Sequence, residues 1–561
     1  MDAGTRALTV EDILKLERID GVFTKTVDVS PSRQQLAVVV TQGHADLDHA
    51  ALPFLLGRDL GRLHLIDLNS DTATIVSAPD TVGYSSPLYS PDGRHLAVVA
   101  ANVDGLTVGV IDLNTLDVSV YSGRQLLIDY QRQPPFQWLD SNTLVCQLLP
   151  ANQRPISLEV TCHVRDIAPK AWTQAMGNRR PTASPLNIDD AIEAEGETVL
   201  LALLGNQLKV IAERESYQSA ILAFEQRAPA GRTNEDALVD YYACEHLLWQ
   251  CQGLMVQGWR SNQGGELRVR EGDQPPRCLL KLNSHLQDVH TGSVMDLPYS
   301  LSDGRPGNVR CILPPSHATG QRHPALMFVY PRINRALDSR AHHLVQGPDL
   351  VYNAHLFAAL GYVVLEPDLP FDSQLDGELI DALPKAVIPA IEVADQAGLI
   401  DRDNVQVFGQ SAGGWAVMSL LATTSVFRSG ISLAGVSDVL SCSTQPDMRF
   451  RYQATQTNMH SIRMGDRMLG IDEKPWQAPQ RYVYNSPLYR VDAIQAPLLL
   501  MHGDLDYVDI SQSEAMFMAL KAEEKAVEFV RYWGEDHVYC SAANIRDAFE
   551  RLTQWLARHA E

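Results

Sequence analysis

The sequence is poor in positive charge and contains no long apolar stretch. Its 46 lysine and arginine residues are outnumbered by 68 aspartate and glutamate residues, which leaves a formal net charge of −22. Such a surface repels phosphate backbones and anionic lipid headgroups, so we expect neither nucleic-acid binding nor membrane-surface binding. The longest apolar runs, such as 325–330 and 496–501, are far shorter than the roughly 20 residues of a membrane-spanning helix.

Closely spaced cysteines and an export signal are also absent. The eight cysteines include no CxxC pair, and the smallest spacing is that from Cys244 to Cys251. This pattern predicts no metal site and no disulfide framework, and cysteines in apolar runs, such as Cys146, are typical of free thiols in a reducing compartment. The N-terminus carries acidic residues where a signal peptide needs a basic flank. We therefore expect a cytoplasmic protein.

With 561 residues, the chain is too long for one ordinary core. Residues 1 to about 290 consist of short β-type runs separated by turn residues. The turn and strand at 30–39 recur at 90–99, and the sequence at 65–69 recurs at 110–114. A degenerate further copy occupies 139–145. Strand repeats of roughly 40 to 50 residues predict a β-propeller, here of six or seven blades, whereas a β-sandwich with coincidental turns is the alternative.

From about residue 300 onward, buried strands alternate with helices, which predicts a mostly parallel sheet covered on both faces. We therefore expect a helical N-terminal segment at 1–20, a β-propeller at 21–295 and an α/β-hydrolase domain at 296–561. The segment 10–19 has a helical pattern, and it either packs on the second domain or frays as a terminus. The expected strands of the second domain lie at 325–330, 362–366, 405–408, 430–434, 497–501 and 527–530.

A G-x-S-x-G pattern follows one of these strands and leads into a helix. Ser411 is its central residue, between Gly409 and Gly413. A strand, a sharp turn and a helix around this pattern are typical of a nucleophile elbow, where the serine is held in a strained backbone conformation above the sheet. The alternative is a glycine-rich turn with a purely structural role.

A serine hydroxyl is a weak nucleophile until a base accepts its proton, and the base needs an acid to orient it. In this fold class both follow the serine in the order acid, base. The loop after 497–501 contains Asp506, our candidate acid, with Asp504 and Asp509 as competitors. His537 lies in the loop between the strand at 527–530 and a final helix expected from about 543 to 559, and it is our candidate base.

With these residues in place, the region 320–561 resembles the catalytic domain of the prolyl oligopeptidase family of serine peptidases. The resemblance implies a β-propeller before the hydrolase domain and chemistry that needs no cofactor. It further implies that Ser411 is the nucleophile, Asp506 the orienting acid and His537 the base. The segments that carry the resemblance are 356–364, 409–414, 427–435 with Asp438, Ser486-Pro487, 502–513 and 534–537.

The resemblance also implies an oxyanion hole made by the Tyr330 hydroxyl and the Ala412 amide. For Tyr330 the alternative is a buried aromatic residue at a strand end. Two positions depart from the family pattern, because Pro-Arg-Ile-Asn stands at 331–334 where many members have Gly-Gly-Pro, and Ala412 replaces a tyrosine or asparagine. Arg332 is a candidate for binding a substrate carbonyl or carboxylate, although a solvated loop arginine is the simpler interpretation.

Together these observations predict a serine hydrolase that cleaves short peptides through an acyl-enzyme on Ser411, with the propeller as a size filter. The alternative is a tailoring esterase, isopeptidase or acyl-transferring cyclase acting on one metabolite or modified peptide. A third hypothesis is a binding module that retains a hydrolase shell. The expected partner is a peptide or a small acyl substrate, and the sequence makes no prediction of the oligomeric state.

Overall fold

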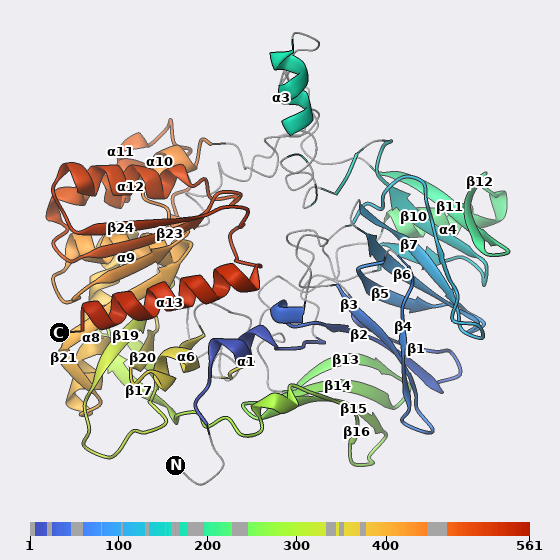
Figure 1. Ribbon diagram of the computed structural model, residues 1–561, viewed down its shortest axis with the longest axis horizontal. Coiled ribbons are helices and arrows are strands. Elements are labelled where there is room, and N and C mark those ends of the chain that lie inside the picture. The colour runs from blue at the N-terminus through green and yellow to red at the C-terminus, as the bar shows by residue number, and fades with distance from the viewer. Residues whose placement is uncertain are drawn as a thin grey trace. The chain divides into compact units, whose positions relative to one another are not determined.

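A computed structural model places most of the chain in two compact units (Figure 1). One unit contains Lys15–His285, and the other contains the described residues up to Leu14 and those from Leu286 onward. Each unit is described by itself below. The structure describes residues 6–19, 25–46, 60–79, 81–102, 105–128, 134–151, 153–155, 158, 163, 168–177, 196–226, 245–331, 344–346, 353–370, 377–445 and 468–560.

The unit formed by Lys15–His285 consists mainly of antiparallel strands that follow one another in sequence order. The described strands form four successive groups of four, and a pairing of Gly61 with Tyr84 joins the first two groups into one sheet. Two helices, α3 (Ala168–Met176) and α4 (Gln218–Glu225), lie in the connections. The groups are β1 (Val27–Val29), β2 (Gln35–Thr41), β3 (Gly61–Asp67) and β4 (Ala73–Val76); β5 (Gly83–Tyr89), β6 (His95–Asn102), β7 (Gly105–Asp112) and β8 (Val118–Val120); β9 (Phe136–Trp138), β10 (Thr143–Leu148), β11 (Glu197–Leu204) and β12 (Gln207–Ile211); and β13 (Glu245–Cys251), β14 (Leu254–Ser261), β15 (Gly264–Glu271) and β16 (Arg277–Leu282).

The sequence repeats occupy equivalent places in these groups. Ser30 and Ser90 each lie in the turn between the first and second strands of their group. In both turns the serine hydroxyl accepts a hydrogen bond from the backbone N–H five residues later, at 3.1 Å from Gln35 and 3.0 Å from His95. Repeated four-stranded antiparallel units are therefore established for the described residues. Their closure into a propeller, and the expected number of six or seven blades, stay predictions.

The other unit is built on an eight-stranded sheet with the order β17-β18-β20-β19-β21-β22-β23-β24. The first two strands pair antiparallel with their neighbours, and the pairs from β20 onward are parallel. Each of the six strands expected from the sequence overlaps one of the strands from β19 to β24. Their bounds are β17 (Val294–Ser300), β18 (Pro306–Ile312), β19 (His323–Phe328), β20 (Val363–Pro367), β21 (Ile400–Gln410), β22 (Gly430–Leu433), β23 (Leu498–Gly503) and β24 (Val527–Tyr532).

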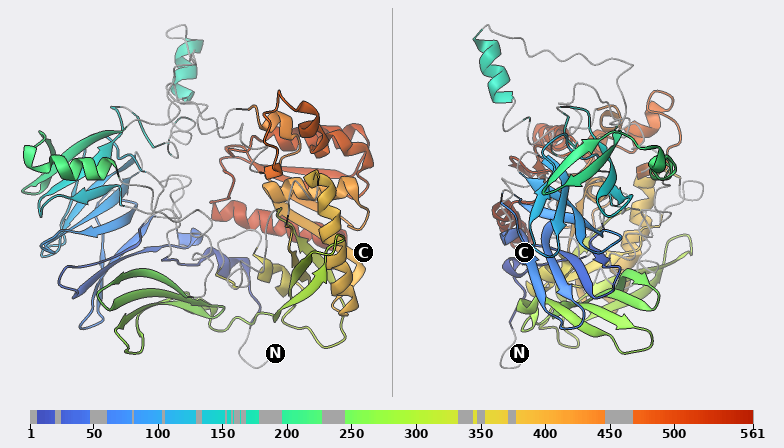
Figure 2. Two further views of the ribbon diagram at one scale, coloured as in Figure 1. Left: turned by 180° about the vertical axis from the view of Figure 1, so that it is seen from behind. Right: turned by 90° about the vertical axis from the view of Figure 1, so that its right-hand side faces the viewer.

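Helices cover both faces of this sheet (Figures 1 and 2). The helices α8 (Leu379–Gln396), α9 (Ala412–Thr423) and α12 (Ser511–Ala522) share one apolar core with the alternate strand residues that face them. On the opposite face lie α6 (Ala354–Ala359) and α13 (Ala542–Arg558). There the Phe357 ring of α6 lies 5.7 Å from the ring of Phe328 in β19 and 5.7 Å from that of Phe549 in α13. Two shorter helices, α10 (Val439–Cys442) and α11 (Pro479–Tyr484), complete the α-helices of the described part after β22.

The start of the chain packs on this same unit. It contains α1 (Val10–Leu14), which contacts α13. Arg6 forms ion pairs with Asp12 at 2.7 Å and Asp288 at 3.0 Å, and Glu11 accepts a hydrogen bond of 2.8 Å from Arg546 in α13. Of the two alternatives for the N-terminal segment, packing on the second domain therefore holds for the residues up to Leu14. The helix expected over 10–19 ends at Leu14, and residues 15–19 are not helical and belong to the other unit. Throughout the described ranges, no helix is both long enough and apolar enough to cross a membrane.

Candidate active site

Ser411 occupies the turn between β21 and α9. Its backbone has φ +57° and ψ −122°, a conformation that costs energy for any residue with a side chain. The neighbouring glycines allow the strand and helix to approach at this point. A Cβ at Gly409 would lie 2.3 Å from the Gly413 carbonyl oxygen, and one at Gly413 would lie 2.3 Å from that of Val329. The turn therefore has the geometry of a nucleophile elbow, with the helix N-terminus directly after the serine.

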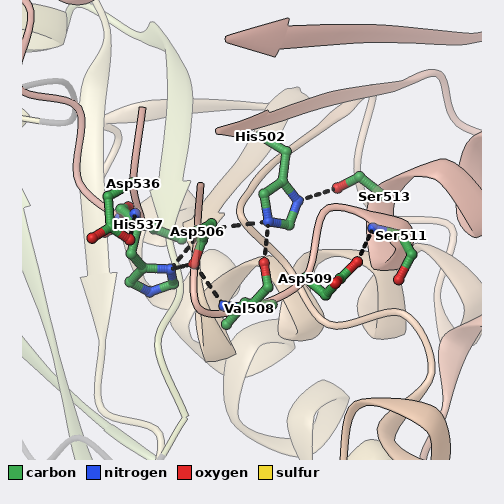
Figure 3. A network of polar contacts seen from close by, with 9 residues as sticks. His502, Asp506, Val508, Asp509, Ser511, Ser513, Asp536 and His537 are labelled. Atoms are coloured by element: carbon green, nitrogen blue, oxygen red, sulfur yellow. Dashed lines mark hydrogen bonds and ion pairs between the residues drawn. The ribbon is translucent and has the colours of Figure 1, made fainter. Parts of the chain in front are cut away.

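His537 and Asp506 meet in the loops that follow the adjacent parallel strands β24 and β23. The Nδ1 atom of His537 lies 2.9 Å from both carboxylate oxygens of Asp506 (Figure 3). Because an ionised carboxylate only accepts hydrogen bonds, Nδ1 carries the hydrogen, and in the neutral ring Nε2 is then the basic nitrogen. Asp506 is 1% exposed and His537 is 8% exposed. The pair thus has the donor, acceptor and burial of an oriented general base.

One hydrogen bond ties the serine turn to the histidine loop. The side-chain amide of Gln410, the residue just before Ser411, donates to the backbone carbonyl of His537 at 2.6 Å. The acid and histidine loops are joined as well, because the Leu505 N–H donates to the Glu535 carbonyl at 3.0 Å. The three loops that carry Ser411, Asp506 and His537 therefore converge at the carboxyl ends of the parallel strands, where open α/β sheets bind their ligands.

The electrostatics of Asp506 favour its charged form. Burial alone raises the pKa of this carboxyl group, but His537 and the hydrogen bonds from His502 and His537 outweigh burial and lower the pKa to about 2. The Val508 N–H donates a further hydrogen bond of 2.7 Å to the same carboxylate. Asp506 is consequently negative at neutral pH and stabilises a positive charge on His537.

The two competing aspartates contact other groups. Asp504 accepts a hydrogen bond of 2.6 Å from the Gly534 N–H, and burial raises the pKa of its carboxyl group. Asp509 accepts a hydrogen bond of 2.9 Å from the N–H of Ser511, the first residue of α12. The structure thus places Asp506, and neither competitor, against the Nδ1 atom of His537. That Asp506 orients His537 during a reaction stays a prediction.

Tyr330 lies two residues beyond β19 and is 41% exposed. The alternative of a buried aromatic residue is therefore wrong. Its Cδ2 atom is 3.4 Å from the position that a Cβ at Gly413 would occupy, so the ring lies beside the first turn of α9. Ala412 is the first residue of α9, and the first N–H groups of a helix have no acceptor within the helix. Arg332 lies outside the described residues.

Several residues that shape the site were not predicted to have a role there. Gln410 occupies a position that the G-x-S-x-G pattern leaves open, so the pattern carries no signal for it. The buried carboxylate of Glu535 accepts hydrogen bonds from the backbone N–H groups of Cys540 and Ser541 at 2.7 and 3.0 Å. It also accepts one from Asn544 at 2.7 Å, and burial raises its pKa. His502 lies in the segment 502–513 that carries the family resemblance, but the sequence assigns it no function. Within the described ranges, no three His, Cys, Asp or Glu side chains are grouped as metal ligands.

Comparison with known proteins finds a family model that matches the region of the candidate active site. Residues 348–561 match the model of the prolyl oligopeptidase family. Among curated proteins, the uncharacterized peptidase YtmA of Bacillus subtilis is 29% identical over 207 residues, which cover 36% of this chain and 74% of YtmA. Dipeptidyl aminopeptidase BIII of Pseudoxanthomonas mexicana is 29% identical over 214 residues, which cover 36% of this chain but 29% of that protein.

Solved structures extend the likeness to the whole chain. The AtxE2 isopeptidase without ligand has a TM-score of 0.66 at 16% sequence identity, and the alignment covers 99% of this chain and 96% of that chain. At this level of identity the likeness concerns the fold. It shows that both units of this chain, and not only the family region, have counterparts in a single solved protein.

Proposed function

We propose that the chain is a serine peptidase of the prolyl oligopeptidase type that cleaves short peptides through an acyl-enzyme on Ser411. The observation that carries the proposal is the convergence of three loops. The loop of the elbow serine is hydrogen-bonded to that of His537, and His537 is hydrogen-bonded to a buried, ionised Asp506. A merely structural glycine-rich turn requires none of these contacts.

In the proposed reaction, the Ser411 Oγ attacks the carbonyl carbon of the scissile bond as His537 Nε2 takes its proton. The new C–O bond forms as the carbonyl π bond opens, and the oxyanion accepts hydrogen bonds from the Ala412 N–H and the Tyr330 hydroxyl. The amine then leaves with the proton held by His537, which produces the acyl-enzyme. Water, deprotonated by His537, attacks the ester and regenerates Ser411. Asp506 remains charged throughout and stabilises the imidazolium.

The proposal includes the architecture and location of the protein. The four-stranded antiparallel units of Lys15–His285 support a β-propeller before the hydrolase domain. Such a propeller would admit short or unfolded peptides and exclude folded proteins. The buried free thiols Cys146, Cys311 and Cys442 support residence in a reducing compartment, and we propose the cytoplasm.

A second candidate function keeps the mechanism but narrows the substrate to one modified peptide or metabolite. It is favoured by the fold likeness to an isopeptidase over 99% of the chain. The departures at Pro331 and Ala412 from the family pattern favour it too. A panel of short peptides, simple esters and isopeptide-linked peptides separates the two. Turnover of many unrelated short peptides would contradict a dedicated tailoring enzyme, and turnover of isopeptide-linked peptides alone would contradict the general peptidase.

The proposed nucleophile is tested by reaction with a fluorophosphonate, followed by intact-mass measurement. The Ser411 oxygen would bond to phosphorus, fluoride would leave, and the serine proton would pass to His537. We expect a single adduct on the parent protein and on a control variant that keeps Ser411, and no adduct on Ser411→Ala. The reaction of His537→Ala should be slower than that of the parent protein by about 100-fold or more. The exposed Ser425→Ala serves as the matched control. A parent protein that forms no adduct, or an adduct that persists in Ser411→Ala, would contradict the proposal.

A further inference from the structure

A second histidine lies against the carboxylate that orients His537. His502 is the penultimate residue of β23 and its side chain is completely buried. Its Nε2 atom lies 2.8 Å from the Val508 carbonyl oxygen and 3.3 Å from Oδ2 of Asp506. Its Nδ1 atom lies 2.8 Å from the hydroxyl of Ser513 in the first turn of α12 (Figure 3). The ring thus connects β23, the acid loop and α12.

The hydrogen-bond partners determine the orientation of this ring. A backbone carbonyl only accepts, so the Nε2 atom of His502 carries a hydrogen and points it at Val508 and Asp506. In the neutral ring Nδ1 is then an acceptor, and the Ser513 hydroxyl is the group that can donate to it. Rotation of the ring by half a turn would place carbon atoms against both partners and leave buried polar groups unpaired, which is costly.

The Asp506 turn is held at two points by this ring. The Asp506 carboxylate accepts a hydrogen bond of 2.7 Å from the Val508 N–H, two residues later in the same turn. The His502 ring, which belongs to β23, contacts the carbonyl of the same Val508 and the second carboxylate oxygen of Asp506. These two contacts attach the turn to the strand. The two carboxylate oxygens therefore have contacts with Val508 and His502 in addition to those with His537, and these contacts define the plane of the carboxylate.

Serine, histidine and aspartate in this order resemble a second catalytic group, but burial excludes that function. Ser513 is 1% exposed, His502 is 0% exposed and Asp506 is 1% exposed. No substrate reaches a hydroxyl in such a position without unfolding of the surrounding structure. The group therefore acts on the site through Asp506.

We infer that His502, oriented by Ser513, is a positioning residue that holds the Asp506 carboxylate in the plane required by His537. The inference rests on the proposed function, since it concerns the acid of the same site. It assigns to the buried His502–Ser513 pair a role in the rate of Ser411 acylation and none in substrate binding. Groups that orient metal ligands from behind contribute about 10- to 100-fold to affinity or activity, and we expect an effect of the same order for His502.

The test compares two replacements of His502 in the full-length protein. His502→Leu removes the N–H that faces Asp506, whereas His502→Gln keeps an amide N–H that can reach the same place. We expect His502→Leu to slow the limiting rate of fluorophosphonate reaction at Ser411 by about 10- to 100-fold with unchanged reagent affinity, and His502→Gln to restore most of that rate. Equal rates for His502→Leu and the parent protein, or equal loss in both variants, would overturn the inference.

Ser513→Ala is a milder variant, because it keeps the buried imidazole ring of His502 in the core. It removes the hydroxyl that fixes the orientation of His502, so we expect a smaller loss of rate than in His502→Leu. Ser443→Ala is the matched control, because Ser443 is equally buried and, in the described structure, its hydroxyl has no hydrogen-bond partner. A Ser513→Ala rate equal to that of Ser443→Ala would contradict the role of Ser513.

A spectroscopic measurement separates this inference from the proposed function. The hydrogen between His537 Nδ1 and Asp506 gives a proton NMR signal far downfield, assigned by its loss in His537→Ala. We expect the signal to move or broaden in His502→Leu and to be retained in His502→Gln. If the parent protein fails to react with the fluorophosphonate, the proposed function fails, and this signal still tests the positioning role. An unchanged signal in His502→Leu would overturn the inference even if Ser411 reacts normally.

Discussion

Asp506 keeps its negative charge where water does not reach it. The cost of burial is offset by donors on every side, namely His537, His502 and the Val508 N–H. The net result is a pKa of about 2, compared with an ordinary value of 3.8. A difference of this size corresponds to about 2 kcal/mol of stability at neutral pH. A carboxylate with so many donors is stabilising only while it is ionised.

The pH dependence of unfolding tests this account. The pKa of Asp506 is lower in the folded state, so its contribution is present above about pH 4 and is lost as the pH falls through about 2. We therefore expect Asp506→Asn to destabilise the unit that contains it at pH 7 and to make its stability less sensitive to acid. Urea unfolding at pH 7 and at several values from about pH 4 down to about pH 2 measures both effects. The exposed Asp401→Asn is the control. An unchanged acid dependence in Asp506→Asn would contradict the assigned pKa.

At the scale of elements, the active site depends on how loops are closed after the parallel strands. The loop from β24 to α13 carries His537 and is closed by Glu535, which accepts the N–H groups of Cys540 and Ser541. Ser541 is also the N-cap of α13, so one carboxylate joins the loop to the start of the helix. A negative group at a helix N-terminus is further stabilised by the helix dipole. The position of His537 therefore depends on a residue that does not react.

Replacement of Glu535 by glutamine tests the role of this loop closure. The amide NH₂ of glutamine would face at least one of the three N–H donors that now contact the carboxylate. An unsatisfied buried donor costs about 1–3 kcal/mol. We expect Glu535→Gln to lower the melting temperature and to slow the reaction of Ser411, whereas the exposed Glu550→Gln on α13 changes neither. Normal reactivity of Glu535→Gln would show that the loop does not need this carboxylate.

At the scale of the whole molecule, the two units have separate apolar cores. The core beneath α8, α9 and α12 lies in the unit with the eight-stranded sheet. The antiparallel strands of Lys15–His285 enclose their own clusters. The beginning of the chain is distant in sequence from the sheet of its unit, and it is held there by Arg6, which contacts Asp12 and Asp288. We therefore expect two thermal transitions, one for each unit.

Removal of the Arg6 side chain should destabilise one unit alone. Asp12 is buried and would lose its ion pair with Arg6 while keeping its hydrogen bonds from Thr9, so Arg6→Ala should lower the transition of the unit with the eight-stranded sheet by a few degrees. Calorimetry measures this, and the loss of fluorophosphonate reactivity on heating identifies the transition. Arg94→Ala is the control, because Arg94 is highly exposed and lies in the other unit. A shift of the other transition in Arg6→Ala would contradict the packing of the N-terminal segment.

Local sequence patterns predicted the elements well where the residues of a segment by themselves indicate how it is buried. The strands of the parallel sheet are continuous apolar runs bounded by turn residues, because they are covered by helices on both faces. The elbow is local at Gly409, which lies against Gly413 of the following helix. The final helix was expected from about 543 to 559 and spans Ala542–Arg558. In each case the residues that determine the structure are close together in the chain.

The exposure of Tyr330 and the packing of the N-terminal segment could not be derived in this way. An aromatic residue at a strand end is compatible with burial or with exposure, and its surroundings at the start of α9 come from a segment some 80 residues later. The helical pattern of α1 indicated an apolar face but did not identify the helix that covers it. Contacts between distant segments leave little trace in a single sequence.

By itself, the sequence determined the six parallel strands from β19 to β24 and the candidate residues Ser411, Asp506 and His537, because turn glycines and apolar strands are locally encoded. It left Asp504 and Asp509 as competitors for the acid. Only the tertiary structure placed Asp506 against His537 and against the buried His502, whose ring in turn contacts Ser513. The physical reason is that the strength and direction of a charge in a protein interior depend on which donors the fold brings to it from distant strands and loops.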